Sequence, residues 1–531
     1  MQDLHDSGIT RSYEWRIEQL QRMRQLVLNN KPAIAQALYH DLGKSYTEAV
    51  GAEITLLLGE VDHSLSHLKE WMQPQLVGSP AATIPAWTTV TPCPKVGPAC
   101  LILGPSNYPF SLSLQPAVGA LAAGNPVIIK PSELCVATAA LLQQLCDQYF
   151  DPSAVKLIQG GISETQQLLQ EPWGLIFFTG SEKVGKIVAT AAAQTLTPTI
   201  LELGGKCPAY VDSTHPPLQQ MADRIVWAKF FNTGQTCAAI DTLVVHQDVV
   251  DKLVPALLTS LERQYPAPRQ TSELGRIVAK QHAQRLYDLI AQVETKCQIL
   301  CGGTGECNVD ERYIAPTLLL NLPNDCRLAQ EEIFGPILPI VTVFSEEEAV
   351  AYIRNMYGTP LCLYVFTQRS AVLERLRLQC RAGGVMRNDA LIFLASQDAP
   401  FGGLGSSGYG SYHGKYSFEA LSHYQTCMTR ATGPGTDFGN LRCHPFGDTM
   451  PHQTTSKPII LPHPRSFKSR ILDHIFQIVP NIPVLHTRRI LFTLLLLFVA
   501  HCYVPRETVA GWLAHRLEWM AATLRRSCIA R

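Results

Sequence analysis

The sequence predicts an α/β protein built from two parallel-sheet domains, and two observations carry that prediction. The chain has 531 residues, well beyond the roughly 250 to 300 residues at which a single hydrophobic core stops growing. Short apolar runs also alternate with helical stretches, first from about residue 98 to 202 and again from about 205 to 388. This alternation is typical of repeated βαβ units, whose strands pair in parallel.

Composition narrows the class of protein. Hydrophobic residues make up 46% and charged residues 17%, which indicates a globular chain. Lys and Arg total 44, as do Asp and Glu, so no overall field favours nucleic acid as a partner. The 16 cysteines are scattered without a Cys-x-x-Cys pair, which favours reduced thiols in the cytosol and argues against a metal site. The opening MQDLHDSGIT has acids and no apolar core, so no secretory signal peptide is expected.

The expected elements follow in order along the chain. Between Arg11 and about Met72, apolar residues recur every three or four positions, which predicts amphipathic helices. The proline-rich segment 78–97 cannot be helical and is expected to be an extended arm or linker. The predicted strands are 100-CLIL, 127-VIIK, 155-VKLI and 175-LIFF in the first series, and 242-TLVVH, 338-LPIVTVF and 361-LCLYVFT in the second. Residues 431–466 are rich in Gly, Pro, His and Thr and indicate a flexible linker.

Two segments are candidates for a dinucleotide site. In 178-FTGSEKVGKIV an apolar run ends at Gly180, Ser181 can cap a helix, and Gly185 permits close approach of the backbone. Helix N-termini favour anions such as a pyrophosphate, although a plain capped helix after a strand explains the same pattern. In 128-IIKPSE, Lys130 and Glu133 follow a strand end, where ligands of open α/β sheets bind. A solvated loop is the alternative.

Three further segments are candidates for covalent catalysis. In 231-FNTGQTCAAID, Cys237 follows a polar turn whose N–H groups would polarise an exposed thiol; a small buried cysteine is the alternative. Glu202, between leucines in 201-LELGGKCP, is expected to have a raised pKa suited to a general base, or else to be a surface acid at a strand end. Asn107, in the turn 104-GPSNYPF, can donate an N–H to an oxyanion, although turn asparagines are common.

Taken together, these motifs resemble the NAD(P)-dependent aldehyde dehydrogenases, particularly the class 3 branch that includes fatty aldehyde dehydrogenase. The resemblance covers about residues 8–443 and rests on an ordered series of motifs: TRSYEWRIEQL, GPSNYPF, AAGNPVIIKPSE, FTGS-x-x-VGK, LELGGK, FNTGQTC, EEIFGP and FGGLGSSGYGSYHGK. It implies the aldehyde dehydrogenase fold, with a Rossmann-like cofactor domain, a catalytic domain and a small oligomerisation arm. The implied ranges are 1–77 and 98–202 for the NAD(P)-binding domain, 203–409 for the catalytic domain, and 78–97 with 410–430 for the arm.

The resemblance also implies roles for individual residues. Cys237 would be the nucleophile, Glu202 the general base, and the Asn107 side chain with the Cys237 N–H the oxyanion site. The implied cofactor-binding residues are Lys130 and Glu133 for the adenosine ribose, Gly180, Ser181 and Gly185 for the pyrophosphate, Glu332 for the nicotinamide ribose, and Phe334 beside the nicotinamide. Asn388 matches an active-site asparagine of the family. Glu133 favours NAD because a carboxylate repels a 2′-phosphate, while class 3 enzymes often use NADP as well.

The implied reaction is oxidation of an aldehyde to a carboxylic acid, through a thiohemiacetal and then a thioester on Cys237. Glu202 would activate the water that hydrolyses the thioester. The sequence departs from the family pattern at Ser106, Ile240 and Arg387, each of which is expected to reshape the substrate tunnel. A cysteine-dependent esterase or acyl transferase, and a catalytically inactive membrane-tethered scaffold, are the competing functions.

The carboxyl-terminal segment predicts membrane association. Residues 490–504 form an apolar run flanked by arginines, but shorter than the ~20 residues that span a bilayer. Beyond it, an amphipathic pattern with Arg516, Arg525 and Arg526 is typical of an interfacial helix. Residues 467–531 are therefore expected to tether a cytoplasmic catalytic domain to a membrane, which suits medium- to long-chain, lipid-derived aldehydes. Packing of this tail on a soluble cytosolic enzyme is the alternative, and the arm implies a homodimer.

Overall fold

The computed structural model describes residues 1–79, 86–270, 273–323 and 325–432. The chain divides into two compact units, and the first, made of Met1–Gln75 and Thr89–Cys427, contains both large sheets. The second unit is described at 76–79, 86–88 and 428–432, which are mostly strand. The predicted linker from 433 onward and the predicted tail 467–531 lie outside the described residues. No helix within the described ranges is long and apolar enough to cross a membrane.

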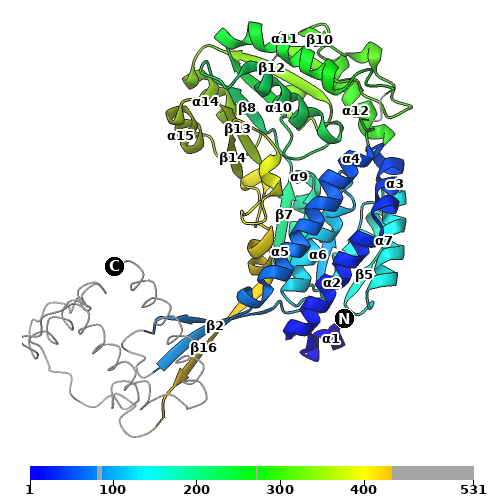
Figure 1. Cartoon of the computed structure of the whole chain (residues 1–531), viewed down its shortest axis with the longest axis vertical. Helices are drawn as coiled ribbons and strands as arrows, with labels where there is room; N and C mark the ends of the chain where they lie inside the picture. The colour runs from blue at the N-terminus through cyan, green and yellow to red at the C-terminus, as the bar shows by residue number, and fades with distance from the viewer. Residues whose placement is uncertain (80–85, 271–272, 324, 433–531) are drawn as a thin grey trace, which may run out of the picture. The chain divides into compact units, whose positions relative to one another are not determined.

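Amphipathic helices precede the first sheet, as the apolar periodicity predicts. They are α1 (Gln2–Asp6), α2 (Tyr13–Asn29), α3 (Lys31–Leu42), α4 (Tyr46–Ala49) and α5 (Leu56–Trp71), with a π-helical turn at Val50–Thr55 before α5. Ser12 caps α2 by accepting the Trp15 N–H. The buried face of that helix carries Leu20, Met23 and Val27. This apolar face packs against α5 and α6 (Ser111–Ala122), as can be followed in Figure 1.

The first sheet has the order β15-β7-β6-β3-β4-β5. Its strands are β3 (Cys100–Leu103), β4 (Val127–Lys130), β5 (Val155–Leu157), β6 (Leu175–Gly180), β7 (Thr199–Leu203) and β15 (Gly408–Tyr409). Neighbouring strands are parallel except β15, which runs antiparallel to β7 and pairs Gly408 with Glu202. Helices α7 (Val136–Tyr149), α8 (Ile162–Leu168) and α9 (Glu182–Gln194) follow β4, β5 and β6. Because parallel strands share one carboxyl edge, the residues that follow β3, β4, β6 and β7 lie at that edge.

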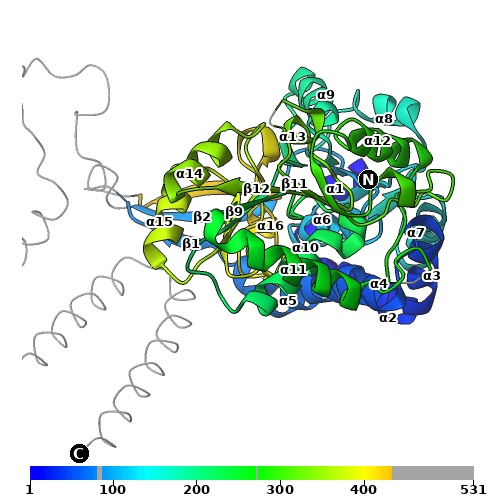
Figure 2. The same ribbon diagram turned by 90° about the horizontal axis from the view of Figure 1, so that it is seen from above.

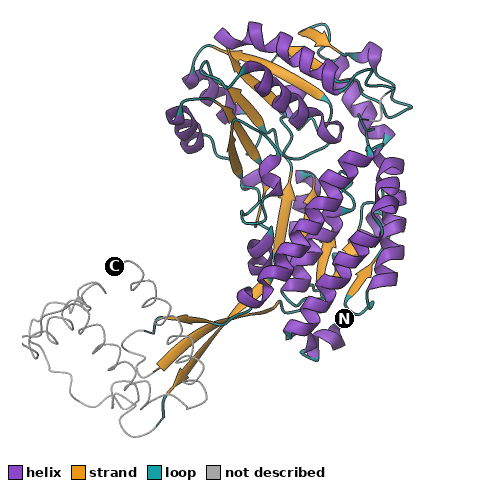
Figure 3. Cartoon of the chain, in the orientation of Figure 1, coloured by secondary structure: helices purple, strands orange, loops and turns teal. Residues whose placement is uncertain are grey.

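The second sheet has the order β10-β11-β12-β9-β8-β13-β14, in which β10 is antiparallel to β11 and the other pairs are parallel. Its strands are β8 (Pro208–Val211), β9 (Thr242–His246), β10 (Gln298–Cys301), β11 (Thr317–Leu320), β12 (Ile337–Val343), β13 (Cys362–Phe366) and β14 (Gly384–Arg387). The surrounding helices are α10 (Leu218–Phe230), α11 (Gln247–Gln264), α12 (Lys280–Ala291), α14 (Glu346–Asn355) and α15 (Ser370–Gln379). Helix α11 packs against β9 and β12 (Figure 2). Figure 3 shows the strands among helices, and the predicted α/β fold class is confirmed.

The segment predicted to be extended contains strand β2 (Ala86–Pro94). This strand forms a three-stranded sheet of order β1-β2-β16 with β1 (Gln75–Val77) and β16 (Ser422–Arg430). The prediction of extended rather than helical structure is therefore confirmed for residues 86–94. The physical reason is that proline lacks the N–H group that a helix interior requires.

Candidate active site

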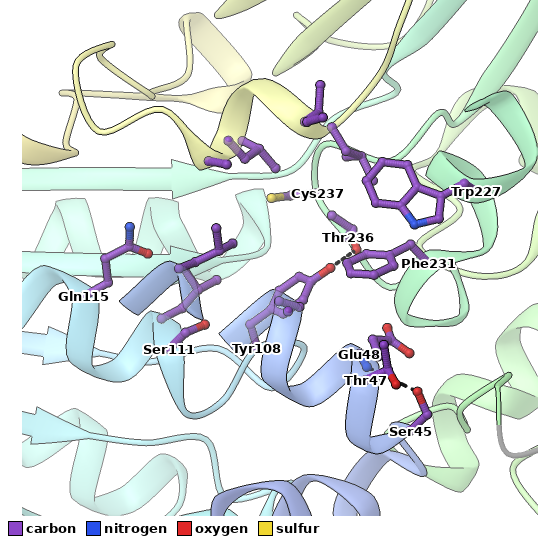
Figure 4. A pocket seen from close by; sticks show the side chains of 18 of the residues that line it. Ser45, Thr47, Glu48, Tyr108, Ser111, Gln115, Trp227, Phe231, Thr236 and Cys237 are labelled. Atoms are coloured by element: carbon purple, nitrogen blue, oxygen red, sulfur yellow. Dashed lines mark hydrogen bonds between the residues drawn. The ribbon is translucent and has the colours of Figure 1, made fainter. Parts of the chain in front are cut away.

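A cavity of about 580 Å³ opens beside Cys237. Aromatic side chains line much of it, namely Tyr108, Trp227, Phe231, Tyr265, Phe401 and Tyr412. Figure 4 shows the Cys237 sulfur projecting into this space. A mostly apolar cavity with a few polar groups is typical of a site for a small hydrophobic ligand.

The turn before Cys237 has a strained left-handed backbone. Asn232, Thr233 and Gly234 have φ angles of 53°, 57° and 72°. Left-handed conformations cost of order 1–3 kcal/mol at residues other than glycine, so surrounding contacts must hold the turn. One of them is a hydrogen bond of 2.6 Å from the Asn232 N–H to Glu48 Oε1, a carboxyl oxygen on α4. The fold therefore imposes the geometry in which the nucleophile candidate is presented.

The Cys237 thiol is half-buried, and the expectation of an exposed thiol is wrong. Burial raises the pKa of this thiol, and the nearby carboxyls of Glu332 and Glu202 raise it further, against a smaller lowering by the Ala238 N–H. The physical reason is that the turn faces the apolar cavity rather than solvent, which disfavours the thiolate. Burial at this position thus favours the neutral thiol over the thiolate.

Glu202 lies at the end of β7 with only 4% of its surface exposed. Neither of its carboxyl oxygens has a hydrogen-bond partner among the described residues. Burial raises the pKa of this carboxyl well above its usual value, which confirms the expected direction and excludes the alternative of a surface acid. A buried carboxyl without partners, close enough to Cys237 to influence its pKa, is a candidate proton acceptor.

Two N–H donors at the Cys237 turn have capacity left for a further hydrogen bond. The Asn107 amide donates to the Gln235 carbonyl at 3.0 Å. A side-chain amide carries two N–H donors, and the second donates to no acceptor within the described part of the chain. The Cys237 backbone N–H likewise donates to no described acceptor. Because Gln235 lies in the same turn as Cys237, this hydrogen bond joins the Asn107 side chain to the turn that carries the thiol.

The predicted pyrophosphate segment begins helix α9. Ser181 accepts the Val184 N–H and caps this helix. A side chain at Gly180 would collide with the Phe178 ring, and one at Gly185 with Leu203. The close packing of these neighbours therefore explains why both positions are glycine. The helix start also opens on a second cavity of about 420 Å³, lined by Ser181, Gly204, Gly205 and Glu332 among others, so the N–H groups there can hold an anion.

Glu332 belongs to a loop that a buried ion pair and its hydrogen bonds hold in place. Lys206 Nζ lies 2.5 Å from Asp241 Oδ1 and donates to the Glu331 carbonyl at 2.9 Å. Asp241 Oδ2 accepts the Ile333 N–H at 2.9 Å. Burial raises the pKa of the Glu332 carboxyl to about 8. The next residue but one, Phe334, has a left-handed φ of 50°. The loop thus presents Glu332 to the second cavity.

Lys130 and Glu133 lie at the carboxyl end of β4. Lys130 Nζ is 2.7 Å from Glu133 Oε2, and the lysine is buried while the glutamate is half-exposed. Although burial opposes ionisation, the hydrogen bond from Lys130 lowers the pKa of Glu133. The charged carboxylate is able to accept hydrogen bonds from sugar hydroxyls. Neither residue lines the two cavities, but both share the carboxyl edge of the sheet with the start of α9.

The structure corrects the expectation for the three positions that depart from the family pattern. None of Ser106, Ile240 and Arg387 lines the cavity beside the nucleophile. Ile240 is fully buried in the core, and Arg387 donates to the Thr367 carbonyl at 3.0 Å. The Ile240 side chain is thus used in core packing, and that of Arg387 in a hydrogen bond at a strand end. Asn388 similarly accepts the Thr367 N–H at 2.9 Å rather than facing the cavity.

Sequence reasoning missed the buried polar residues that hold the site together. Asn232 and Lys206 lie inside motifs that were already recognised, so their motif positions were a usable signal. Lys44 and Glu48 lie in the helical amino-terminal region, where no motif marks them. Their burial, at 1% and 9% exposure, is visible only in the folded chain.

A thiol that faces an apolar cavity, together with a helix start at a second cavity that can bind phosphate, is typical of a dinucleotide-dependent oxidoreductase with a reactive cysteine. Comparison with known proteins specifies the class further. The family model described as "Aldehyde dehydrogenase family" matches residues 10–427. The chain belongs to this family, and the resemblance of its motifs is confirmed.

The relatives are members of family 3. "Aldehyde dehydrogenase family 3 member H1" of Arabidopsis thaliana is 41% identical over 428 residues, covering 80% of this chain and 87% of that protein. "Aldehyde dehydrogenase family 3 member B1" of Homo sapiens is 42% identical over 436 residues, covering 82% and 91%. These identities support the class 3 branch.

Similar solved structures are also aldehyde dehydrogenases. A "substrate bound state" of Staphylococcus aureus AldH has a TM-score of 0.77 and 36% identity, covering 90% of this chain and 97% of that one. A mutant of P. syringae AldA indole-3-acetaldehyde dehydrogenase in complex with NAD+ and IAA has a TM-score of 0.73 and 26% identity, covering 81% and 87%. The chain is therefore an NAD(P)-dependent enzyme that oxidises aldehydes.

Proposed function

We propose that the substrates are medium- to long-chain aliphatic aldehydes, with Cys237 as nucleophile, Glu202 as general base, and Asn107 with the Cys237 N–H as oxyanion donors. One observation carries this proposal. The Cys237 sulfur opens on a large apolar cavity while the neighbouring Glu202 carboxyl is buried without a partner. The remote cavity walls contribute binding, and the two polar groups perform the chemistry.

The residues act in sequence. As the Cys237 sulfur bonds to the carbonyl carbon, its proton passes to solvent water and negative charge develops on the aldehyde oxygen, which the Asn107 and Cys237 N–H groups would stabilise. A donor of this kind typically contributes about 2.7–4 kcal/mol to lowering the barrier. NAD(P), when bound, supplies the acceptor for the hydride. Glu202 then takes a proton from the water that attacks the thioester, which releases the carboxylic acid and restores the thiol.

The same proposal assigns the cofactor contacts. The N–H groups at the start of α9, with Gly180, Ser181 and Gly185, would hold the pyrophosphate. Glu332 would hold the nicotinamide ribose beside Phe334. The Lys130 and Glu133 pair would hold the adenosine ribose, and its carboxylate favours NAD, with NADP as a second cofactor. The second cavity supports this assignment because Ser181, Gly204, Gly205 and Glu332 all line it.

Chain-length dependence tests the substrate class. Each methylene buried in an apolar cavity contributes about 0.8 kcal/mol, so kcat/KM is expected to rise from acetaldehyde to hexadecanal when NADH absorbance is followed. A decrease in kcat/KM with chain length would overturn the proposed substrate class.

The Cys237→Ala variant is expected to form no NADH with any aldehyde. Ester hydrolysis by wild-type enzyme without NADH formation would instead favour the esterase function.

Domain organisation, assembly and location complete the proposal. The NAD(P)-binding domain comprises 1–77 and 98–202, and the catalytic domain 203–409. The arm segments 78–97 and 410–430 support a homodimer, and 467–531 tethers a cytoplasmic enzyme to a membrane through its apolar and basic pattern. Fractionation of the full chain and of a chain ending at Pro445 tests the tether. Recovery of both chains in the soluble fraction would contradict the membrane tether. A monomeric mass in light scattering would contradict the homodimer.

A further inference from the structure

We propose that the buried ion pair of Lys44 and Glu53 positions the oxyanion donor Asn107, so that both are positioning residues for the reaction. This inference rests on the role proposed above for Asn107. Neither charged residue lies in a sequence motif of the site, and neither is used by the chemistry itself. Their effect would be exerted through the segment 107–111, which they hold at both of its ends.

The contacts of this pair converge on one short segment. Lys44 Nζ lies 2.5 Å from Glu53 Oε1, and both side chains are 0% exposed. Lys44 Nζ also donates to the Asn107 carbonyl at 2.8 Å. The other carboxyl oxygen, Glu53 Oε2, accepts the N–H groups of Phe110 at 2.9 Å and Ser111 at 3.0 Å. The cation therefore binds the start of the segment and the anion binds its end.

The held segment is also bonded to the turn that carries the nucleophile. Asn232 donates its side-chain N–H to the Asn107 carbonyl at 2.9 Å, the same oxygen that Lys44 binds. The Tyr108 hydroxyl lies 2.7 Å from Thr236 Oγ1, the residue before Cys237, a contact drawn in Figure 4. A shift of the segment would therefore change the position of the Asn107 amide relative to the Cys237 sulfur.

Local backbone geometry directs both charges inward. Lys44 follows Gly43, which ends α3 in a left-handed conformation with φ of 65°. Glu53 lies in the π-helical turn Val50–Thr55, whose residues Gly51 and Ala52 line the substrate cavity. π-Helical turns are rare and are frequent at functional sites. The same turn thus shapes the cavity and supplies the anion of the pair.

A requirement for stability does not explain such a pair. Desolvation of two charges often exceeds their attraction, and replacing a buried pair by neutral residues is often neutral or stabilising. The surrounding core is extensive and apolar, with Leu57, Leu114 and Ala117 nearby in sequence on α5 and α6. What the charges add is directional hydrogen bonding to three backbone groups. Because a misplacement of about 1 Å can cost 10²-fold in rate, this bonding has a direct use in catalysis.

The test is the double variant Lys44→Met with Glu53→Gln, which removes both charges of the pair together. The expected result is a loss of kcat of about 10- to 100-fold, with NAD binding and KM for the aldehyde nearly unchanged. Each assay is run below the Tm of the variant. In an Asn107→Ala background the same double substitution is expected to cost less than about twofold, because its effect passes through Asn107.

Arg16→Met is the matched control. Arg16 is also a buried cation that donates to backbone carbonyls, those of Thr10 and Ala122, at the far end of α6 from Ser111. Its replacement is expected to lower Tm while kcat stays within about twofold of wild type. A fall in kcat that matches the double variant would show a general effect of destabilisation and would overturn the inference.

The other outcomes separate this inference from the proposed function. If Asn107→Ala alone keeps full activity, the proposed oxyanion role fails. The positioning role fails if Asn107→Ala loses activity while the Lys44 and Glu53 variant keeps kcat within about twofold. It also fails if the combined variant loses kcat by the full product of the losses in the two separate variants. Should the double variant not accumulate as folded enzyme, Lys44→Gln, which keeps a neutral donor, is expected to show an intermediate loss that again vanishes in the Asn107→Ala background.

Discussion

The carboxyl group of Glu332 lies against the Cα of Gly204, so closely that a methyl group at position 204 would overlap it. Gly204 follows β7, whereas Glu332 comes from the loop after α13 (Arg327–Gln330). Both residues line the second cavity. A glycine in one motif is thus required by a carboxyl from another motif far along the chain.

Gly204→Ala is expected to displace Glu332 without unfolding the protein, because the group in the way is the flexible end of a side chain. The expected result is a rise of about tenfold or more in the Kd for NAD, measured by fluorescence titration, with little change in Tm. Gly305→Ala is the control, since a side chain there meets nothing within 4 Å. An unchanged Kd in Gly204→Ala would contradict a role for Glu332 in binding the ribose.

Glu202→Gln is expected to separate the two halves of the reaction. Hydride transfer needs no base after the adduct forms, so rapid mixing should show a burst of NADH of about one equivalent per site. The steady-state rate should then fall by roughly 10²- to 10⁴-fold because hydrolysis lacks its base. Burial raises the pKa of Glu202, so the wild-type rate should increase with pH as the base form appears. If Glu202→Gln keeps this pH dependence or shows no burst of NADH, Glu202 is not the base that activates the water.

Glu60→Gln is expected to change how stability depends on pH. The Glu60 carboxyl is 0% exposed and accepts the Gly414 N–H at 2.7 Å. Burial raises its pKa from 4.5 to about 7. The stability from this protonated group is present below pH 4.5 and is lost as the pH rises through about 7. In wild type this carboxyl makes the unfolding free energy fall as the pH rises from about 5 to 8. In Glu60→Gln, which cannot ionise, that fall should be smaller by roughly 2–3 kcal/mol. Denaturant titrations measure this, and exposed Glu14→Gln should leave the curve unchanged.

Gly51→Trp is expected to shorten the substrate cavity. Gly51 lines the cavity, and a Cβ added there meets nothing within 4 Å, so a larger side chain has room to begin at this position. The KM for hexadecanal should rise by about tenfold or more while that for acetaldehyde stays within about twofold. Gly51→Ala is the size control and should resemble wild type. An equal rise for both aldehydes would show that the long chain does not bind along this wall.

Local sequence patterns predicted many of the elements of the fold, although not the strands β7, β8, β10, β11 and β14. The runs 100-CLIL and 242-TLVVH became β3 and β9, because an apolar run bounded by turn residues has few other stable conformations in a large α/β chain. The spacing of Leu20, Met23 and Val27 predicted the buried face of α2. Each of these inferences depends only on residues close together in the chain.

The environment of the site was harder to predict. Cys237 was found from its motif, but it is half-buried with a raised pKa rather than exposed. Arg387 was expected near the substrate and instead donates to the Thr367 carbonyl. Both errors concern what surrounds a side chain, which depends on residues that are distant in sequence.

The sequence by itself determined the order of helices and strands and the kinds of reacting groups, a thiol, a carboxyl and an amide. Only the tertiary structure decided that the Glu202 carboxyl has no partner, that Glu332 lies over Gly204, and that a buried ion pair holds the Asn107 turn. The reason is that hydrophobic periodicity acts over a few residues, whereas burial and hydrogen bonding at the site arise from contacts between segments that folding brings together.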